Sequence, residues 1–510
     1  MKNILKEKKY TIILIAILLV GIITRIIGFG EIPIGINVDE AGIMYDAYCI
    51  ANYGTDRYDN SYPIYMINFG GGQSALYTYL VAGLIKIFGF SLTVVRIPAL
   101  VFSILYLIFA FLITKDFKNK KLAILVEFIA VIIPWHFMKS RWAFDCNLMS
   151  SMMLISIYTL LKAKKPIMYI LAGILFGITL YTYALSYVII PIFLLLILGY
   201  MLYTKKIKIR NIIVMFIPLI ILAIPLLLYL MVNFGWIPEI KTPYISILKM
   251  WEFRSNEISI SNIFTNFLKI FKSMFAFDNN DFNAFPIFGT VYYISIPFAI
   301  IGFVQSIKAV KRDIKEKMLS LDIVMLINFV AVFICGLIIE PQIYRINAIF
   351  ISIIYYIGVG IMYTSNERKN ILITFVAIYI AMFIWFLCYY FGVYGKENKN
   401  SSFNESVIEV TNYIEENEKF DGKYINMRAF ATQQYIYTLL ANKTPPKEFI
   451  ATANIDQMVY GYDRYIFYNF DINDNTVYVL ESENEIKQLL EHLGFIREKF
   501  NDTIDIFYME

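Results

Sequence analysis

The sequence predicts a polytopic α-helical membrane protein with about eleven transmembrane helices and a small α/β domain at its C-terminal end. Three observations favour this fold class. Hydrophobic residues make up 59% of the 510-residue chain and the mean hydropathy is +0.61, whereas soluble domains are about half apolar. Apolar runs of about 20 residues recur, and each is long enough to cross a hydrocarbon layer about 30 Å thick. From residue 395 onward the chain is more polar and loses this pattern.

Short clusters of Lys and Arg separate the apolar runs and mark the predicted cytoplasmic loops. They are 2–9, 115–121, 162–165, 205–210, 308–317 and 368–369. If all of them lie inside, the predicted spans are 10–29, 94–114, 121–137, 147–161, 167–183, 185–203, 211–232, 288–307, 321–339, 344–363 and 370–392. The N-terminus is then cytoplasmic, and the C-terminal domain lies outside the plasma membrane.

Two apolar segments need a separate explanation. Segment 75–90 is short, and counting it as a span would place the basic cluster 115–121 outside, so we expect a helix that lies in the membrane interface. The N-terminus is basic and then apolar, as in a signal peptide, but it lacks a small-x-small cleavage site. We therefore expect an uncleaved first span.

The pattern divides the chain into a transmembrane domain, residues 1–394, and an extracytoplasmic α/β domain, residues 395–510. Two long outer loops, 30–93 and 233–287, belong to the first of these. The patterns in the second predict strands at 424–427, 464–470 and 476–481, a helix over 483–494 ending at Gly494, and a hairpin over 495–509 turning at Asn501 and Asp502.

Charge and cysteine content argue against several classes of protein. The net charge of +5 is small and the Lys and Arg residues lie between the apolar runs, so we expect no nucleic-acid partner. The four cysteines are scattered without a C-x-x-C pair, which argues against a zinc site or a disulfide framework.

Ionisable residues gather at the predicted outer ends of the helices. Charge beside an apolar bundle is costly and usually has a partner or a task. The residues are Asp39 and Glu40 after the first span, His136, Lys139, Arg141 and Asp145 between the third and fourth, and Glu340 and Arg345 between the ninth and tenth. Although distant in sequence, they could meet in one outward cavity.

These residue types suit transfer of a group from a lipid phosphate. Asp39 could accept the proton of an attacking hydroxyl as a general base. Arg345 or Lys139 could neutralise the departing phosphate. Asp145 or Glu40 could hold a divalent metal, Mg²⁺ or Mn²⁺, that bridges the phosphate. A donor with a polyprenyl tail would need a groove within the membrane.

Most of these residues also have a purely structural interpretation. The alternatives are a capping box from Asn37 to Glu40, an i,i+4 ion pair of Arg141 with Asp145, a Lys139 that extends to the headgroups, an interfacial His136, and an ion pair of Glu340 with Arg345. The run Gly70–Gly72 is expected to be a loop hinge, because no P-loop context follows it.

Three features together resemble the GT-C superfamily of membrane glycosyltransferases, and especially its family-39 type, which includes protein O-mannosyltransferases and the lipid A aminoarabinose transferase. The features are the Asp-Glu pair after the first span, the segment from Arg141 to Leu148 and the eleven-span layout, within residues 10–365. The resemblance implies that Asp39 is the catalytic base with Glu40 beside it, that Asp145 is the acid of the second loop, and that Arg345 faces the donor phosphate. Lys139 and Arg141 are further candidates for binding that phosphate. The segment 73–80 lacks the prolines of the P-P-L-Y-type motif that relatives often carry there.

We therefore expect an inverting glycosyltransferase of the bacterial plasma membrane. It would take a sugar from a polyprenyl-phosphate carrier and pass it to a glycan, lipid or protein on the outer face. A lipid-linked sugar transporter or flippase is one alternative, although that class usually has charges near mid-membrane and internal repeats. A polysaccharide polymerase or ligase is another, although the loop 233–287 holds only Arg254 and no His. A non-catalytic scaffold would tolerate Asp39→Asn.

Overall fold

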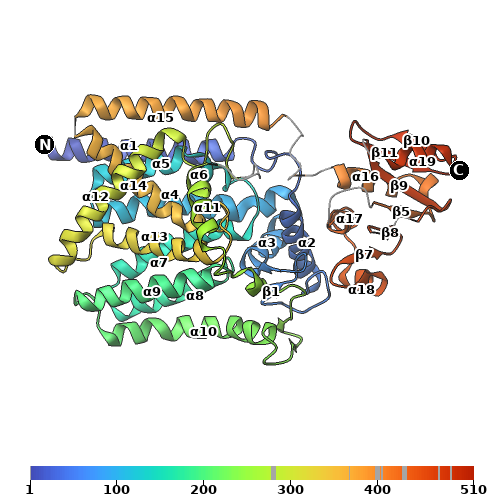
Figure 1. Cartoon of the computed structure of the whole chain (residues 1–510), viewed down its shortest axis with the longest axis horizontal. Helices are drawn as coiled ribbons and strands as arrows, with labels where there is room; N and C mark the ends of the chain where they lie inside the picture. The colour runs from blue at the N-terminus through green and yellow to red at the C-terminus, as the bar shows by residue number, and fades with distance from the viewer. Residues whose placement is uncertain are drawn as a thin grey trace.

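A computed structural model describes residues 2–276, 283–366, 368–396, 403, 406–427, 433–468, 471–482 and 485–510. Long helices lie side by side in one bundle, and the C-terminal domain lies at one end of it (Figure 1). Helices α2 and α3 occupy the end of the bundle nearest this domain, and α10 and α15 lie on opposite sides of the bundle. The bundle helices are α1 (Lys2–Ile26), α2 (Val38–Tyr53), α3 (Ala75–Phe88), α4 (Leu92–Phe117), α5 (Lys120–Ile132), α6 (Pro134–Met138), α7 (Met149–Lys162), α8 (Pro166–Leu180), α9 (Ser186–Tyr203), α10 (Ile209–Asn233), α11 (Ile263–Phe275), α12 (Ile296–Lys315), α13 (Leu321–Ile338), α14 (Phe350–Ser365) and α15 (Lys369–Tyr389).

The chain is a multi-pass membrane protein. Within the described residues, seven helical segments are long and apolar enough to cross a membrane. They are Leu92–Phe117, Ser186–Tyr203, Ile209–Asn233, Tyr293–Lys315, Leu321–Ile338, Asn347–Ser365 and Lys369–Tyr394. A helix occupies each of the eleven predicted positions, but the count of eleven spans is not confirmed.

The shorter helices explain this difference. Helices α5, α7 and α8 have 13, 14 and 15 residues, which is about 20–23 Å at 1.5 Å per residue. The apolar part of α1, Tyr10–Ile26, is also one of the shorter apolar helices. Helix α5 ends at Ile132 because Pro134 disfavours helical backbone at Ile133, which is extended. The segment predicted to lie in the interface is α3, a helix of 14 residues, and its place in the interface stays a prediction.

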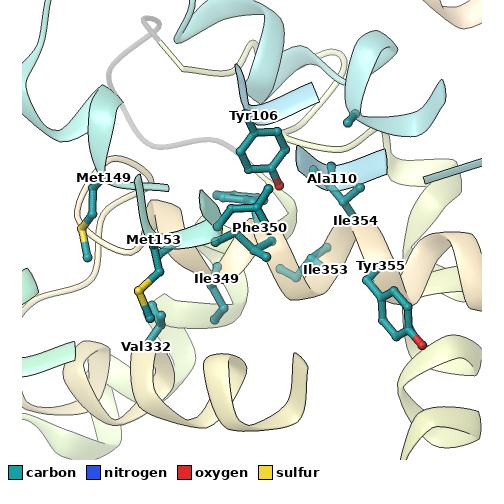
Figure 2. Packing of buried hydrophobic residues seen from close by; sticks show 14 of the residues in the cluster. Tyr106, Ala110, Met149, Met153, Val332, Ile349, Phe350, Ile353, Ile354 and Tyr355 are labelled. Carbon is teal, nitrogen blue, oxygen red and sulfur yellow. The ribbon is translucent and has the colours of Figure 1, made fainter. Parts of the chain in front are cut away.

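The apolar core of the bundle lies where α4, α7, α13 and α14 meet (Figure 2). Tyr106, Met153, Val332 and Phe350 come from these four helices and are buried against one another. Trp135 of α6 stacks on Phe350 with ring centroids 4.3 Å apart, a favourable aromatic geometry. This contact fixes α6, and with it the loop that carries Asp145, against the start of α14.

The C-terminal domain contains a mixed sheet flanked by short helices, which confirms the predicted α/β class. Among the described residues the strand order is β10-β11-β9-β5-β8-β7-β6. The strands are β5 (Tyr424–Asn426), β6 (Asn454–Ile455), β7 (Val459–Tyr462), β8 (Tyr465–Ile466), β9 (Thr476–Glu481), β10 (Ile496–Lys499) and β11 (Ile504–Tyr508), and the helices are α16 (Ser406–Glu415), α17 (Tyr435–Asn442), α18 (Pro446–Thr452) and α19 (Ile486–His492). β5 pairs in parallel with β8 and β9, and the other pairs are antiparallel.

The structure confirms most elements predicted in this domain. Strand β9 has the predicted bounds, and β10 and β11 form the predicted hairpin, with Lys499 opposite Asp505. Helix α19 ends two residues before Gly494, whose φ is +91°. The strand predicted at 464–470 is shorter, since β8 contains only Tyr465 and Ile466. Residues 469–470 and 483–484 lie outside the described part of the chain.

The C-terminal domain packs directly on α2. Apolar side chains of α2, α3 and the sheet domain form one shared core. The Tyr437 hydroxyl of α17 donates to the Ile36 carbonyl at 3.1 Å, and the Tyr45 hydroxyl of α2 donates to the Thr444 carbonyl. Because Ile36 lies just before α2, these contacts hold the segment that carries Asp39.

Candidate active site

Asp39 lies in the first turn of α2, at the end of the bundle that faces the C-terminal domain. Asn37 caps this helix, because its side chain accepts a hydrogen bond from the Asp39 N–H at 3.0 Å. Glu40 does not complete the predicted capping box and instead binds Arg96. Asp39 is half-buried, so part of the residue is open to solvent.

A hydrogen-bonded network orients the Asp39 carboxylate. Asn68 Nδ2 donates to Asp39 Oδ1 at 3.1 Å, and Arg57 donates to Asn68 Oδ1 at 3.1 Å. Arg57 is itself held by both oxygens of Asp46, at 2.9 and 2.8 Å. The network passes so close to α2 that a Cβ atom added to Gly42 would lie 2.4 Å from Asn68 Oδ1. A side chain at this position would therefore force Asn68 or Arg57 to shift.

The electrostatic surroundings of Asp39 suit a base. Burial raises the pKa of the Asp39 carboxyl above its usual range, and the charges of Arg254 and Arg57 oppose this rise. A carboxylate with a raised pKa takes up a proton more readily than a solvated one.

Asp145 begins the 3₁₀ helix η1 (Asp145–Leu148) and is buried beside this site. Its Oδ2 accepts a hydrogen bond from the Ser74 N–H at 3.0 Å, and its Oδ1 accepts one from the Cys146 N–H at 2.7 Å. Burial and the nearby Asp39 raise the pKa of Asp145 to about 7, while Arg254 and the two N–H groups favour the charged form. Asp39 and Asp145 thus belong to one site.

Arg254, which was not among the site residues predicted from the sequence, is a cation close to both acids. It interacts electrostatically with both Asp39 and Asp145, and its side chain is 36% exposed. It begins the 3₁₀ helix η2 (Arg254–Glu257), and the preceding segment is clamped to α10, where Asn233 Oδ1 accepts from the Met250 N–H at 2.8 Å. The one sequence feature that could have pointed to Arg254 is that it is the only Arg in loop 233–287.

The run Gly70–Gly72 forms the turn between β1 (Tyr65–Met66) and β2 (Gln73–Ser74) beside Arg254. A Cβ atom added to Gly71 would lie 3.3 Å from Arg254 Nε, and one added to Gly72 would lie 2.7 Å from Met250 Sδ. The run is therefore a closely packed turn that lets the segment of Arg254 approach, and not the free hinge that the sequence suggests.

Arg345 joins the same region. Its NH1 pairs with Glu257 Oε2 at 2.8 Å, and its side chain is 16% exposed. Glu257 also lies 4.0 Å from Arg254, so the two arginines share this acid. Asn347 Nδ2 donates to the Cys146 carbonyl at 2.7 Å, which ties this segment to that of Asp145. We call Asp39, Asp145, Arg254 and Arg345 the open cluster.

Glu40 lies next to Asp39 in sequence but faces the interior. Both of its carboxylate oxygens accept hydrogen bonds from Arg96, each at 2.8 Å, and its Oε1 also accepts one from the Ala143 N–H at 2.7 Å. Arg96 also donates to the carbonyls of the segment before α2. Glu40 therefore anchors this segment, and we assign it a structural role.

Arg25, His136, Lys139 and Arg141 form a second group, which we call the closed cluster. None of these side chains has exposed surface. Arg141 donates to the carbonyls of Arg25, Gly28 and Ile32 and to the Tyr390 hydroxyl, at 2.6–3.2 Å. It does not form the ion pair with Asp145 that its spacing suggests, because α6 ends before both residues.

Lys139 and His136 are equally enclosed. Lys139 Nζ donates to Ser150 Oγ and to the Asn147 carbonyl, and lies 4.8 Å from the centroid of the Trp135 ring. Burial lowers the pKa of Lys139 to about 7. His136 Nδ1 lies 2.9 Å from an Arg25 guanidinium nitrogen. Lys139, Arg141 and His136 have no exposed surface and bind protein groups, which favours a structural role. Contact of these residues with a donor phosphate stays a prediction.

Glu340 also lies apart from Asp39. Its carboxylate pairs with Lys269 of α11 on the surface, whereas Arg345 pairs with Glu257. The ion pair of Glu340 with Arg345 that the sequence suggests does not form between side chains, and Arg345 only approaches the Glu340 carbonyl at 3.5 Å.

The sequence also predicts a divalent metal on Asp145 or Glu40. Across the described part of the chain, no three or more His, Cys, Asp and Glu side chains form a group that could hold a metal ion. The carboxylate of Glu40 is already paired with Arg96. Arg254 supplies positive charge close to Asp39 and Asp145. These residues do not fit a resident Mg²⁺ or Mn²⁺ site, and metal dependence stays a prediction.

Three solved structures of membrane glycosyltransferases are similar to this chain. ArnT from Cupriavidus metallidurans in the apo state has a TM-score of 0.59 at 9% identity, over 98% of each chain. The same protein bound to undecaprenyl phosphate has a TM-score of 0.56 at 9% identity, again over 98% of each chain. The oligosaccharyltransferase of Archaeoglobus fulgidus tethered with an acceptor peptide has a TM-score of 0.52 at 12% identity, over 86% of this chain and 63% of its own.

Comparison by sequence adds nothing to this, since no family model and no curated protein matches the chain. At such low identities the likeness concerns the fold. The chain therefore has the fold of the GT-C membrane glycosyltransferases, as its sequence predicts.

Proposed function

We propose that the protein is an inverting glycosyltransferase that moves a sugar from a polyprenyl-phosphate carrier to a glycan, lipid or protein. The observation that carries the proposal is the open cluster, in which the accessible, oriented Asp39 lies in one site with the exposed Arg254. The shared fold adds support, because a protein of this fold is bound to undecaprenyl phosphate.

The proposed reaction uses each member of the open cluster. The acceptor hydroxyl gives its proton to Asp39 while its oxygen bonds to the anomeric carbon. The bond between that carbon and the phosphate oxygen breaks, and the phosphate leaves with the electron pair. Arg254 and Arg345 neutralise its charge. Attack and departure on opposite faces of the sugar invert the anomeric configuration.

Asp145 has a supporting role in this reaction. Its charge attracts Arg254, and its hydrogen bonds from Ser74 and Cys146 join the first and second loops. An ionised Asp145 therefore helps to keep Arg254 beside the phosphate.

The proposal includes an orientation in the membrane. The open cluster and the C-terminal domain lie at the same end of the bundle (Figure 1), and the predicted basic loops lie at the other. The N-terminus would then be cytoplasmic, and the sugar would be transferred on the outer face of the plasma membrane.

The test is sugar transfer by the purified full chain from a panel of polyprenyl-phosphate sugars to candidate acceptors. Wild type is compared with Asp39→Asn and with Asp116→Asn, whose aspartate pairs with Lys162 away from this site. We expect Asp39→Asn to transfer about 10²–10⁴-fold more slowly and Asp116→Asn to match wild type. Equal turnover by Asp39→Asn would remove the assigned base, and no transfer from any monophosphate donor would favour the transporter or polymerase classes.

A parallel assay addresses the metal. Transfer is measured after chelation and again after Mg²⁺ or Mn²⁺ is added back. Since Arg254 and Arg345 provide the positive charge, we expect chelation to leave the rate unchanged. Loss on chelation and recovery with either ion would establish the metal that the sequence predicts.

A further inference from the structure

A side chain of the C-terminal domain reaches the hydrogen-bonded network of Asp39. It belongs to Tyr435, the first residue of α17, and α17 lies at the face of this domain that meets α2 (Figure 1). Arg57 NH1 donates to the Tyr435 hydroxyl at 3.2 Å. The same guanidinium donates through NH2 to Asn68 Oδ1, and Asn68 donates to Asp39 Oδ1, each at 3.1 Å. A continuous path of hydrogen bonds thus leads from the C-terminal domain to the proposed base.

The Tyr435 hydroxyl is held in place by both domains. Tyr435 is 2% exposed. Its ring stacks on that of Phe449 of α18 and meets the edge of the Phe69 ring in the first outer loop, with ring centroids 6.3 Å apart in both pairs. Its hydroxyl also lies 3.0 Å from the hydroxyl of Tyr58. A ring packed on two sides cannot turn without moving its neighbours, so the acceptor offered to Arg57 has a defined position.

The Arg57 guanidinium can transmit this position because it is planar and its donors point in fixed directions. Asp46 accepts from Nε and NH2 at 2.9 and 2.8 Å, and the Gly42 carbonyl accepts from NH2 at 3.0 Å. Tyr435 binds the third nitrogen, NH1. Arg57 has no exposed surface, and a buried donor without an acceptor is costly. Loss of the Tyr435 hydroxyl would therefore make the guanidinium tilt away from Asn68.

The position of Arg57 also affects the charge of the base. Burial raises the pKa of the Asp39 carboxyl, and the charges of Arg254 and Arg57 lower it. The other titratable groups that interact with Asp39 are Asp145, Cys146, Tyr344 and Tyr437. Among all these groups, Arg57 is the one that binds Tyr435. A tilt of Arg57 away from Asn68 would move its charge away from Asp39 and raise the pKa of this carboxyl further.

We infer that Tyr435 is a positioning residue, through which the C-terminal domain holds Arg57 and Asn68 in the arrangement that orients the Asp39 carboxylate. This inference rests on the proposed function for its effect on the rate, and it gives the C-terminal domain a part in the reaction. Two hydrogen-bonded residues separate Tyr435 from Asp39, so Tyr435 acts through them and not on the substrate.

The kinetic test uses Tyr435→Phe in the full chain, which keeps the packed ring and removes the hydroxyl. We expect kcat for sugar transfer to fall about ten-fold with little change in KM, because misplacing the base affects the reaction more than substrate binding. The acid limb that Asp39 causes in the pH profile should move to higher pH. The matched control is Tyr462→Phe, which removes another buried hydroxyl of this domain, one that donates to Thr438 of α17 at 3.0 Å. It should match wild type. Equal losses in both variants, or an unchanged kcat in Tyr435→Phe, would overturn the inference.

A double-mutant cycle tests the path itself. Residues that act through one network have effects on the rate that do not add. In an Asn68→Ala chain the path is already broken, so Tyr435→Phe should lower kcat less than about two-fold further. A further loss of about ten-fold would mean that Tyr435 acts by another route and would contradict the assigned path.

A third measurement needs no sugar transfer. Asp39→Cys is placed in a Cys388→Ser chain, and the rate of its alkylation by iodoacetamide is followed against pH to give the pKa of the new thiol. A nearby positive charge favours the thiolate. Tyr435→Phe should therefore raise the pKa of this thiol by about 0.3, the Coulomb effect of moving one charge by about 1 Å at close range, whereas Tyr462→Phe should leave it unchanged.

The outcomes separate this inference from the proposed function. An unchanged thiol pKa in Tyr435→Phe would contradict the coupling even if the wild type transfers sugar. A raised thiol pKa together with the expected fall in kcat would support both. A raised thiol pKa without sugar transfer by the wild type would support the link between the C-terminal domain and position 39 and would contradict the proposed reaction alone.

Discussion

The open and closed clusters contain similar residues but have opposite surroundings. The side chains of Arg254 and Arg345 are 36% and 16% exposed, whereas Lys139 and Arg141 have no exposed surface. Arg141 uses its donors on backbone carbonyls and one tyrosine hydroxyl. Arg254 is partly exposed and interacts electrostatically with two acids, Asp39 and Asp145. The comparison teaches that accessibility and partners distinguish a binding cation from a structural one, since residue type and position near an outer helix end are the same for both.

Among the variants that test this comparison, Arg254→Gln should have the largest effect on the rate of sugar transfer. Loss of a cation that stabilises the leaving phosphate should slow transfer about 10²–10³-fold, as loss of a preorganised transition-state contact does, with little change in thermal stability. Steady-state kinetics and a melting curve in detergent measure the two quantities. A rate near that of wild type would move Arg254 out of the catalytic machinery.

Arg141→Gln in the closed cluster should instead lower thermal stability and leave the activity of the folded protein unchanged. The change removes the hydrogen bonds of Arg141 to the carbonyls of Arg25, Gly28 and Ile32, although the Gly28 and Ile32 carbonyls keep the Ile32 N–H and the Tyr390 hydroxyl as donors. A hydrogen bond to a charged group contributes about 1.5–3 kcal/mol. The midpoint of thermal unfolding should therefore fall markedly, and activity should be lost only in proportion to the folded protein. If Arg141→Gln stayed fully folded but lost carrier binding, the closed cluster would belong to the active site after all.

A pH profile tests how Asp145 supports the open cluster. Its pKa is raised to about 7, and an acid with a raised pKa stays protonated until the pH passes that value. If ionised Asp145 holds Arg254, the transfer rate should fall about ten-fold per pH unit below the pKa and level off above it. Asp145→Asn should abolish this fall and leave only the pH dependence that Asp39 causes. A wild-type rate that is flat across pH 7 would contradict the role.

The smallest effect is expected from Gly42→Ala. The added methyl group would collide with Asn68, which must shift and release Asp39 Oδ1 from its hydrogen bond. We expect kcat to fall about ten-fold with little change in KM, because misplacing the base affects the reaction more than substrate binding. Gly83→Ala on α3 is the control, since an added Cβ there meets nothing within 4 Å. An equal loss in both variants would indicate general damage to this end of the bundle.

The fold could be predicted from the sequence because apolar runs between basic clusters determine where membrane helices form. Helices therefore occupy the predicted positions, and β9 and the β10–β11 hairpin follow from alternation and turn residues. The number of spans was harder to predict from the sequence. The helix break at Pro134 and the ends of the short helices α7 and α8 lie inside runs that remain apolar.

The candidate site was only partly predictable. Asp39 and Asp145 stand out because each follows an apolar run at an outer end. No pattern of residues around Arg254 predicts that it belongs to the site, because its position depends on packing against the turn Gly70–Gly72 of a distant loop. The partners of Arg141 could not be predicted, because the sequence does not show that they are carbonyls of the segment 25–32.

The most direct test of this account measures which cluster can be reached, and from which side of the membrane. Asp39→Cys and Ser140→Cys, the latter at a buried residue next to Lys139, are each placed in a Cys388→Ser chain, because Cys388 is the exposed one of the four cysteines. Intact cells are treated with a membrane-impermeant thiol reagent. We predict that Asp39→Cys reacts from outside and is protected by polyprenyl phosphate, while Ser140→Cys does not react. Reaction of Asp39→Cys only after permeabilisation, or equal reaction at both positions, would contradict the account.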